Sequence, residues 1–215
     1  MSERVLALDM STKTGWSLII SGDSEYVLEA YGKIKKIEGT SLERYPISYL
    51  DWAYQCYGEI LKVFEEQRPD VLVIEETAGG SKSAYSQKIL EWIHFLVARL
   101  IQETGITCHY YMTEEWRREC GCLMTKDEKK SNKKRSDIRK TMEVKGPGGH
   151  GAVGLARDEN GKIIGKIGRK HVNVRRANEV FGKFLTEPLK MKDEDTADAL
   201  LLAYAYHSRK VRRNE

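Results

Sequence analysis

Short apolar runs separated by polar turns open the chain. Residues 5–8 form a continuous apolar run that ends in Asp9, and a second apolar run covers residues 16–20. Residues 26–34 can form a third extended segment. Such runs, bounded by turn residues, are typical of strands. The first 34 residues therefore predict a three-stranded meander.

The middle of the chain alternates between helical and strand patterns. Apolar residues recur every three or four positions between residues 50 and 64 and again between residues 89 and 101, which indicates two amphipathic helices. Between them, residues 71–74 form another continuous apolar run, which ends in Glu75. A strand of this kind is expected where both sheet faces are covered. Residues 107–112 predict a fifth strand.

Further helices follow the fifth strand. Thr113 is a candidate N-cap for a short helix that ends near Arg118. Residues 173–184 predict a third long helix, and an acidic helix closes the chain. The order of strands and helices indicates an α/β fold with a mixed sheet.

The acidic residues of the last helix are candidates for a chemical role. Asp195 and Asp198 are three residues apart, so their carboxylates share one face of a helix. Helix capping and the helix dipole also favour acids at this position. However, Asp9 and Glu75 each end a predicted strand. If those two strands are neighbours, all four carboxylates meet at one sheet edge, where open α/β sheets bind ligands.

Four carboxylates at one sheet edge predict a site for hard divalent cations. Oxygen ligands suit Mg²⁺, with Mn²⁺ as a possible substitute. Two such ions, roughly 3.5–4 Å apart, can activate water and stabilise the leaving oxygen of a phosphodiester. No Walker-type glycine loop is present. A zinc site formed by Cys120 and Cys122 with His150 or His171 is the less favoured alternative, because no paired C-x-x-C motif is present.

Positive charge is concentrated in one segment. Residues 124–170 hold 14 Lys and Arg against 6 Asp and Glu, a local charge of +8, whereas the whole chain carries only +4. A charge run is usually a solvated face, but here the run lies beside glycines and the remaining chain is acidic. We therefore expect the segment to bind a nucleic-acid backbone. The candidate DNA-binding residues are Lys129, Lys130, Lys133, Lys134, Arg135, Arg139, Lys166, Arg169 and Lys170.

Length and composition support one domain. With 215 residues and 40% hydrophobic content, the chain can bury one core, so we expect a single domain spanning residues 1–215, with a basic, glycine-rich insertion at about residues 124–170. No run approaches the roughly 20 apolar residues of a membrane span. The first apolar run at the N-terminus is too short, and is followed too early by a charged residue, to be a signal peptide. We expect a cytoplasmic protein, bacterial or phage-encoded, with free cysteines.

Three motifs resemble those of RuvC-type Holliday-junction resolvases, which belong to the RNase H-like (retroviral-integrase-like) nuclease superfamily. They are Leu6-Ala7-Leu8-Asp9 with Thr14-Gly15-Trp16, then Val73-Ile74-Glu75-Glu76, then Asp195-Thr196-Ala197-Asp198-Ala199-Leu200. Their order and approximate spacing agree with the family. The resemblance covers nearly the whole chain except the insertion. It implies an RNase H-like mixed five-stranded sheet flanked by helices, with the basic insertion between the fifth strand and the third helix.

The resemblance also implies a function. Asp9, Glu75, Asp195 and Asp198 would be catalytic, metal-binding carboxylates, and Lys170 lies where the family carries a basic residue important for cleavage. The implied enzyme is a crossover junction endodeoxyribonuclease of DNA recombination and repair. It cleaves four-way DNA junctions to 5′-phosphate and 3′-hydroxyl ends. A homodimer is implied because two related active sites cut a symmetric junction. The second amphipathic helix, with Trp92, His94 and Phe95, is a candidate contact.

The chain also departs from the family. Such resolvases often carry a junction-stacking aromatic soon after the second acid, where this chain has Thr77-Ala78-Gly79-Gly80; Tyr85 is the nearest candidate. The long insertion is a second departure. A nuclease for flaps, other branched DNA or RNA–DNA hybrids, and a non-catalytic nucleic-acid-binding protein, therefore remain alternatives. An actin-like ATPase needs two such domains, for which the chain is too short.

Overall fold

Five strands form one mixed sheet at the centre of the protein. The computed structural model describes residues 2–11, 13–34, 44–76, 84–142 and 155–214. The strands are β1 (Glu3–Asp9), β2 (Gly15–Ser21), β3 (Tyr26–Lys33), β4 (Val71–Glu75) and β5 (Thr107–Tyr111). Their order across the sheet is β3-β2-β1-β4-β5. β1 to β3 pair antiparallel, whereas β4 is parallel to both β1 and β5. The predicted meander and mixed sheet are thus confirmed.

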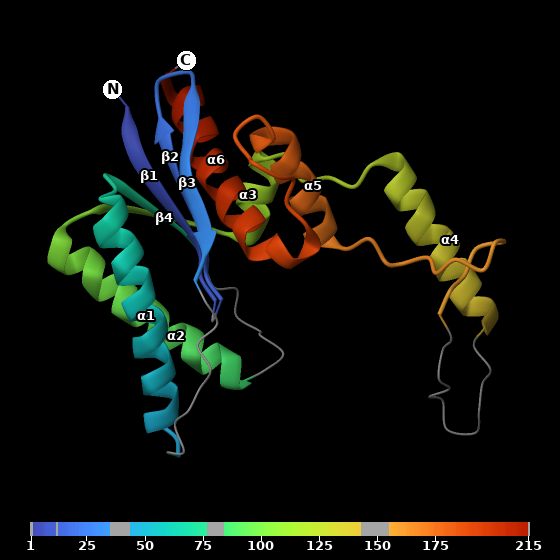
Figure 1. Ribbon diagram of the computed structural model, residues 1–215, viewed down its shortest axis with the longest axis horizontal. Helices are drawn as coiled ribbons and strands as arrows, with labels where there is room; N and C mark the ends of the chain where they lie inside the picture. Colours follow the sequence, from blue (N-terminus) through green and yellow to red (C-terminus); the bar gives the residue numbers. More distant parts are fainter. Residues whose placement is uncertain (1, 12, 35–43, 77–83, 143–154, 215) are drawn as a thin grey trace.

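Helices cover both faces of the sheet (Figure 1). α1 and α2 lie together on one face, whereas α3, α5 and α6 lie on the other. α4 stands apart from both layers. The bounds are α1 (Ile47–Gln67), α2 (Ala84–Thr104), α3 (Thr113–Glu119), α4 (Lys126–Met142), α5 (Arg169–Phe181), a 3-10 turn η1 (Met191–Asp193) and α6 (Glu194–Asn214). None of the described helices has an apolar stretch long enough to cross a membrane.

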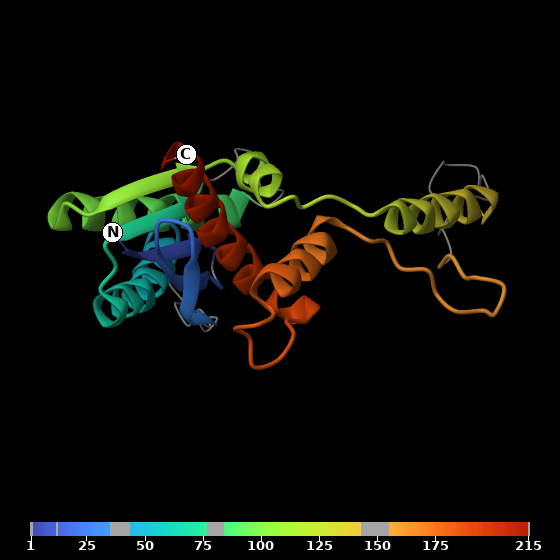
Figure 2. The same cartoon turned by 90° about the horizontal axis from the view of Figure 1, so that it is seen from above.

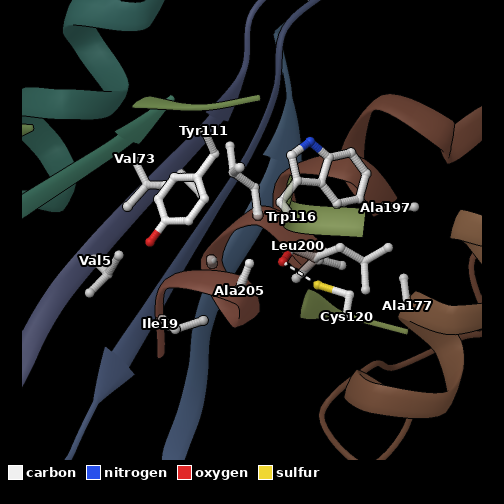
Figure 3. Close-up of a cluster of buried hydrophobic side chains, with 14 of the residues drawn as sticks. Val5, Ile19, Val73, Tyr111, Trp116, Cys120, Ala177, Ala197, Leu200 and Ala205 are labelled. Carbon is white, nitrogen blue, oxygen red and sulfur yellow. Dashed lines mark hydrogen bonds between the residues drawn. The ribbon is translucent and has the colours of Figure 1, made fainter. Parts of the chain in front are cut away.

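Burial on both faces explains the continuous apolar runs of the central strands. Side chains alternate between the two faces of a strand. In β1, Val5 and Ala7 pack against the layer of α6, whereas Leu6 and Leu8 pack against α1 and α2. Figure 3 shows the first of these two cores, in which Trp116 of α3 packs beside Leu200 and Ala197 of α6. The first core fixes α6 across β1 and β2.

α4 is the main element that the sequence patterns did not predict. The charged run was expected to bind a nucleic-acid backbone, and no helix was assigned to it, yet residues 126–142 are helical. Lys, Arg and Glu are good helix formers, and Thr125 and Glu128 form a reciprocal capping box. The Glu128 backbone N–H donates to Thr125 Oγ1 at 3.2 Å, and the Thr125 N–H donates to Glu128 Oε2 at 2.7 Å. The Thr-x-x-Glu spacing is the signal that was available in the sequence.

Two smaller differences concern element ends. α5 begins at Arg169, four residues before the predicted start, and ends at Phe181. Thr113 is the first helical residue of α3 and not its N-cap; the cap is Met112, whose N–H donates to the Glu115 carboxylate at 3.2 Å. The Thr113 side chain is therefore available to the candidate site.

The basic segment forms an arm that projects away from the sheet (Figure 2). The arm comprises residues 124–142 and 155–167. Asn132 joins its two limbs, because its side-chain amide exchanges hydrogen bonds of 2.8 and 2.9 Å with the Ile167 backbone. Residues 158–161 form a tight turn, flanked by one bridge between Arg157 and Ile163. At the root of the arm, Arg175 of α5 pairs with Glu128 at 3.0 Å.

Candidate active site

The C-terminal ends of β1 and β4 lie side by side, as the sequence predicted. Leu8 pairs with Ile74 in the parallel register, so the next residues, Asp9 and Glu75, leave the sheet at the same edge. Parallel strands place their carboxyl ends together. Two acids that are 66 positions apart in the sequence thus meet at one site.

α6 brings the second pair of acids to this edge. Its first turn crosses over Gly15, which pairs with Asp9 across β1 and β2. A Cβ atom at position 15 would overlap the Asp195 carbonyl and lie 2.6 Å from the Thr196 nitrogen. Glycine is therefore required for this close approach. The hydroxyl of Thr196 donates to the Gly32 carbonyl at 3.2 Å and ties α6 to β3.

The four carboxylates interact electrostatically. Burial, and then the charges of Asp198, Glu75 and Asp195, raise the pKa of Asp9 well above its ordinary value. Burial is also the main reason why the pKa of Asp198 rises to about 7. Glu75 adds to this rise, whereas a hydrogen bond from Asn173 and the charge of Arg117 oppose it. Mutual repulsion among partly buried acids favours a bound cation.

Two polar side chains orient these acids, and the sequence analysis singled out neither for this role. Asn173 Nδ2 of α5 donates to Asp198 Oδ1 at 2.7 Å, and the Thr113 hydroxyl donates to Glu75 Oε1. Thr113 follows β5, the strand next to β4. Its place near the site could therefore have been predicted, as that of Glu75 was, from its position just beyond the end of a strand. Asn173 carried no such signal, because it lies on a helix far away in the sequence.

The four carboxylates have the oxygen ligands that suit a hard divalent cation, but their side chains do not form a ready-made metal-binding group. All four acids offer carboxylate oxygens, the ligands that Mg²⁺ and Mn²⁺ prefer. Within the described residues, no three His, Cys, Asp or Glu side chains already stand as a metal-binding group. Asp195 forms an ion pair with Lys33 of β3 instead. Lys33 is a further site residue that the sequence analysis missed.

Lys170 lies at the margin of the site. It forms an ion pair with Glu194, the residue before Asp195. Partial desolvation works against its charge, but the hydrogen bond and charge of Glu194, with Asp195 and Asp198, raise the pKa of Lys170. The structure therefore brings Lys170 near the carboxylates.

The other candidate basic residues lie on the arm or at its return to α5. Lys129, Lys130, Lys133, Lys134, Lys166 and Arg169 are exposed. Lys134 pairs with Glu159 across the arm at 3.2 Å. Arg135 and Arg139 are half-buried and line a cavity of about 260 Å³ together with Lys166. The arm thus projects away from β1, β4 and α6, the elements that carry the four carboxylates (Figure 2).

Other candidates have structural roles or lie outside the described residues. The Cys120 thiol donates to the Leu201 carbonyl at 3.0 Å (Figure 3), and His171 accepts a hydrogen bond from its own helix start. Across the part of the chain that is described, no cluster supports the zinc alternative. His150 and residues 77–80 fall in the gaps between the described ranges, and the side chain of Tyr85 is likewise not described.

Comparison with solved structures identifies the architecture. Thermus thermophilus RuvC in complex with a Holliday junction substrate matches with a TM-score of 0.58 at 13% identity, over 98% of this chain and 96% of that chain. A second structure of Thermus thermophilus RuvC matches at 0.56, with 16% identity and the same coverage. The chain has the RuvC fold. The yeast mitochondrial Holliday junction resolvase Ydc2 matches at 0.53, with 11% identity, over 97% of this chain and 80% of that chain.

The likeness to RuvC is one of fold. No protein-family model matches the sequence, and no curated protein matches it. The RuvC fold confirms the predicted RNase H-like mixed sheet flanked by helices. At such low identity, the roles of individual residues follow from the geometry of the site alone.

Proposed function

We propose that this protein is a divalent-metal-dependent endonuclease that cleaves four-way DNA junctions by phosphodiester hydrolysis, leaving 5′-phosphate and 3′-hydroxyl ends. The observation that carries the proposal is the convergence of Asp9, Glu75, Asp195 and Asp198 at one sheet edge. Three elements that are distant in the sequence supply them, and the pKa values of Asp9 and Asp198 are raised by burial and by their neighbours. The fold that this chain shares with RuvC supports the proposal.

The four carboxylates would hold one or two Mg²⁺ ions, with Mn²⁺ as a substitute. Bound ions would supply charge neutralisation at the phosphate and activation of water. The chain's own residues prepare this site. Asn173 and Thr113 hold Asp198 and Glu75 in place, and Gly15 lets α6 approach β2. Lys170, beside Glu194, would contribute positive charge toward the DNA strand.

The arm would bind the DNA backbone away from the cutting site. α4 carries eight Lys and Arg against three Asp and Glu. Lysine and arginine side chains on one exposed helix neutralise phosphates and release counterions without reading the bases. Because the arm projects from the body beside α5 (Figure 2), it would hold a duplex that extends beyond the cleaved strand.

A homodimer would place two such sites on one junction. On α2, Trp92 is 37% exposed and Phe95 is 60% exposed. Their rings meet edge to face, with centroids 6.2 Å apart. Exposed neighbouring aromatics are common at protein interfaces. We therefore infer that this face of α2 forms the dimer contact.

Cleavage assays test the proposal directly. The protein would be incubated with a labelled mobile four-way junction in Mg²⁺, beside Asp9→Asn and Asp195→Asn variants. Paired, symmetric nicks by the parent, with binding but no cutting by both variants, are the expected result. Three-way, flap and RNA–DNA hybrid substrates serve as comparisons.

The outcomes separate the alternatives. Unpaired cuts, or a preference for flaps or hybrids, would support the proposed metal site but would show that the four-way junction is not the preferred substrate. Junction binding with no cutting in either Mg²⁺ or Mn²⁺ would leave a nucleic-acid-binding protein and would refute the nuclease.

A further inference from the structure

Lys33 lies in the same row of the sheet as the first acid of the candidate site. Asp9 pairs with Gly15 across β1 and β2, and Gly15 pairs with Lys33 across β2 and β3. Directly opposed residues project their side chains on the same face of a sheet. Because Gly15 has no side chain, the space between Asp9 and Lys33 is filled by the first turn of α6, where Asp195 lies.

The Lys33 ammonium group is a positive charge next to Asp195 in the candidate site. It forms an ion pair with Asp195 Oδ2 and lies 3.5 Å from the Lys192 carbonyl oxygen. Both side chains are shielded, with 30% of Lys33 and 17% of Asp195 exposed. Lys170 does not take this role, because it pairs with Glu194.

We propose that Lys33 is a resident counter-ion that neutralises Asp195 while no metal is bound and that must leave when a divalent ion arrives. This inference rests on the proposed function, in which Asp195 is a metal ligand. A carboxylate held by an ammonium group has fewer oxygen lone pairs to offer a second cation. Lys33 therefore lowers the metal affinity of the site and keeps Asp195 neutralised without metal.

The structure gives the displaced side chain a place to move. A cavity of about 340 Å³ opens between β3 and the segment that precedes α6, and Lys33 and Thr196 are among its lining residues. Lys190 and Lys192 line the same cavity, together with Glu187 and Asp193. The Asp193 carboxylate accepts a hydrogen bond from the Lys190 backbone N–H at 2.9 Å. Lys33 can thus turn away from Asp195 without leaving a polar environment.

Direct titration of Mn²⁺ tests the exchange without any need for activity. Free Mn²⁺ would be followed by electron paramagnetic resonance with the full-length chain and no DNA. We expect Lys33→Met to tighten Mn²⁺ binding by about tenfold, since a competing charge a few ångströms from the ion is removed. Lys33→Arg, which keeps the charge, should bind close to the parent value.

Two controls separate exchange from general electrostatics. Lys190→Met removes one positive charge from the same cavity without breaking the Asp195 ion pair, so it should change the affinity far less than Lys33→Met. In an Asp195→Asn background, Lys33→Met should lose its effect, because the partner of Lys33 is gone. Lys33→Gln provides a second neutral variant, and circular dichroism checks that each variant is folded.

Each outcome decides the proposal. Suppose that the parent binds Mn²⁺ in a way that depends on Asp195, but that Lys33→Met and Lys33→Gln bind it no more tightly than the parent. This result would overturn the counter-ion role and leave the proposed nuclease intact. An equal gain in Lys190→Met would also overturn it. If the parent and all variants fail to bind Mn²⁺, both the metal site and the counter-ion role are wrong.

Discussion

The Asn173 side-chain amide donates a 2.7 Å hydrogen bond to the Asp198 carboxylate, and both residues are buried between α5 and α6. This bond favours the charged form of Asp198 and opposes the effect of burial on its pKa. It is a direct link between the helix beyond the arm and the candidate active site.

Removal of this donor should weaken both the site and the fold. We expect Asn173→Ala to destabilise the protein by about 1.5–3 kcal/mol, the range for a lost hydrogen bond to a charged group, and to raise the pKa of Asp198 further. Urea unfolding and Mn²⁺ titration measure the two effects. The control is Asn178→Ala, which removes two hydrogen bonds to the Leu189 backbone and should cost stability without changing Mn²⁺ affinity.

Gly15 should tolerate no side chain. In Gly15→Ala, the new Cβ meets backbone atoms of Asp195 and Thr196, so α6 must shift. We expect a loss of roughly 2–4 kcal/mol of stability, in the upper range for overpacking, and loss of Mn²⁺ binding. Gly58→Ala is the matched control. Its Cβ meets nothing within 4 Å, and it lies within α1, so it should stabilise the helix by about 0.5–1 kcal/mol.

The raised pKa of Asp198 predicts how stability depends on pH in the absence of metal. The ordinary pKa of an aspartate is 3.8, and that of Asp198 in the folded protein is about 7. Between these values the folded state binds more protons than the unfolded state, so stability falls as pH rises through this window. Asp198→Asn removes the titration and keeps an acceptor for Asn173.

Urea unfolding at pH 5 and pH 8 checks this prediction. The parent should lose more stability than Asp198→Asn between the two pH values, by on the order of 2–4 kcal/mol. Added Mg²⁺ should reduce the difference, because a bound cation favours the charged carboxylates. Equal pH dependence in the two proteins would show that Asp198 titrates normally.

The arm should strengthen DNA binding through its positive charge and should not prefer any DNA sequence. Replacement of Lys129, Lys130, Lys133 and Lys134 by Gln should weaken junction binding and lower the slope of log affinity against log salt, by about 0.9 for each phosphate that is no longer neutralised. Replacement of the same four by Arg keeps the charge and should preserve the slope. Fluorescence anisotropy over a range of salt concentrations distinguishes the two. An unchanged slope in the Gln variant would place the DNA elsewhere.

The exposed aromatics of α2 should govern assembly. Phe95→Glu places a charge where a partner would bury an apolar ring, so we expect a shift from dimer to monomer in sedimentation velocity. Val27, which is 53% exposed on β3, offers a control: Val27→Glu should leave the assembly unchanged. A monomeric parent would refute the α2 contact.

Local sequence patterns predicted most of the elements and the positions of the acids. β4 has the predicted bounds, and β1 ends at Asp9 as expected, because a strand that is buried on both faces must be apolar along its length. The spacing of Asp195 and Asp198 required them to share a helix face. These features depend on neighbours in the sequence and could be predicted from it.

The partners of those acids could not be predicted in this way. Thr113, Asn173 and Lys33 reach the carboxylates from the start of α3, from α5 and from β3, and no local pattern records which distant side chain fills a given space. The helix within the charged run was also not predicted, because the run has too few apolar residues to show a helical period, although the cap at Thr125 favoured a helix.

The sequence by itself determined the alternation of strands and helices, the four acids at element ends and the clustering of positive charge between residues 124 and 170. The tertiary structure alone decided that β1 and β4 are neighbours, that α6 crosses at Gly15, and that Asp195 faces Lys33. The physical reason is that periodicity and propensity act over a few residues, whereas strand order, close packing and ion pairing depend on which distant segments meet when the core closes.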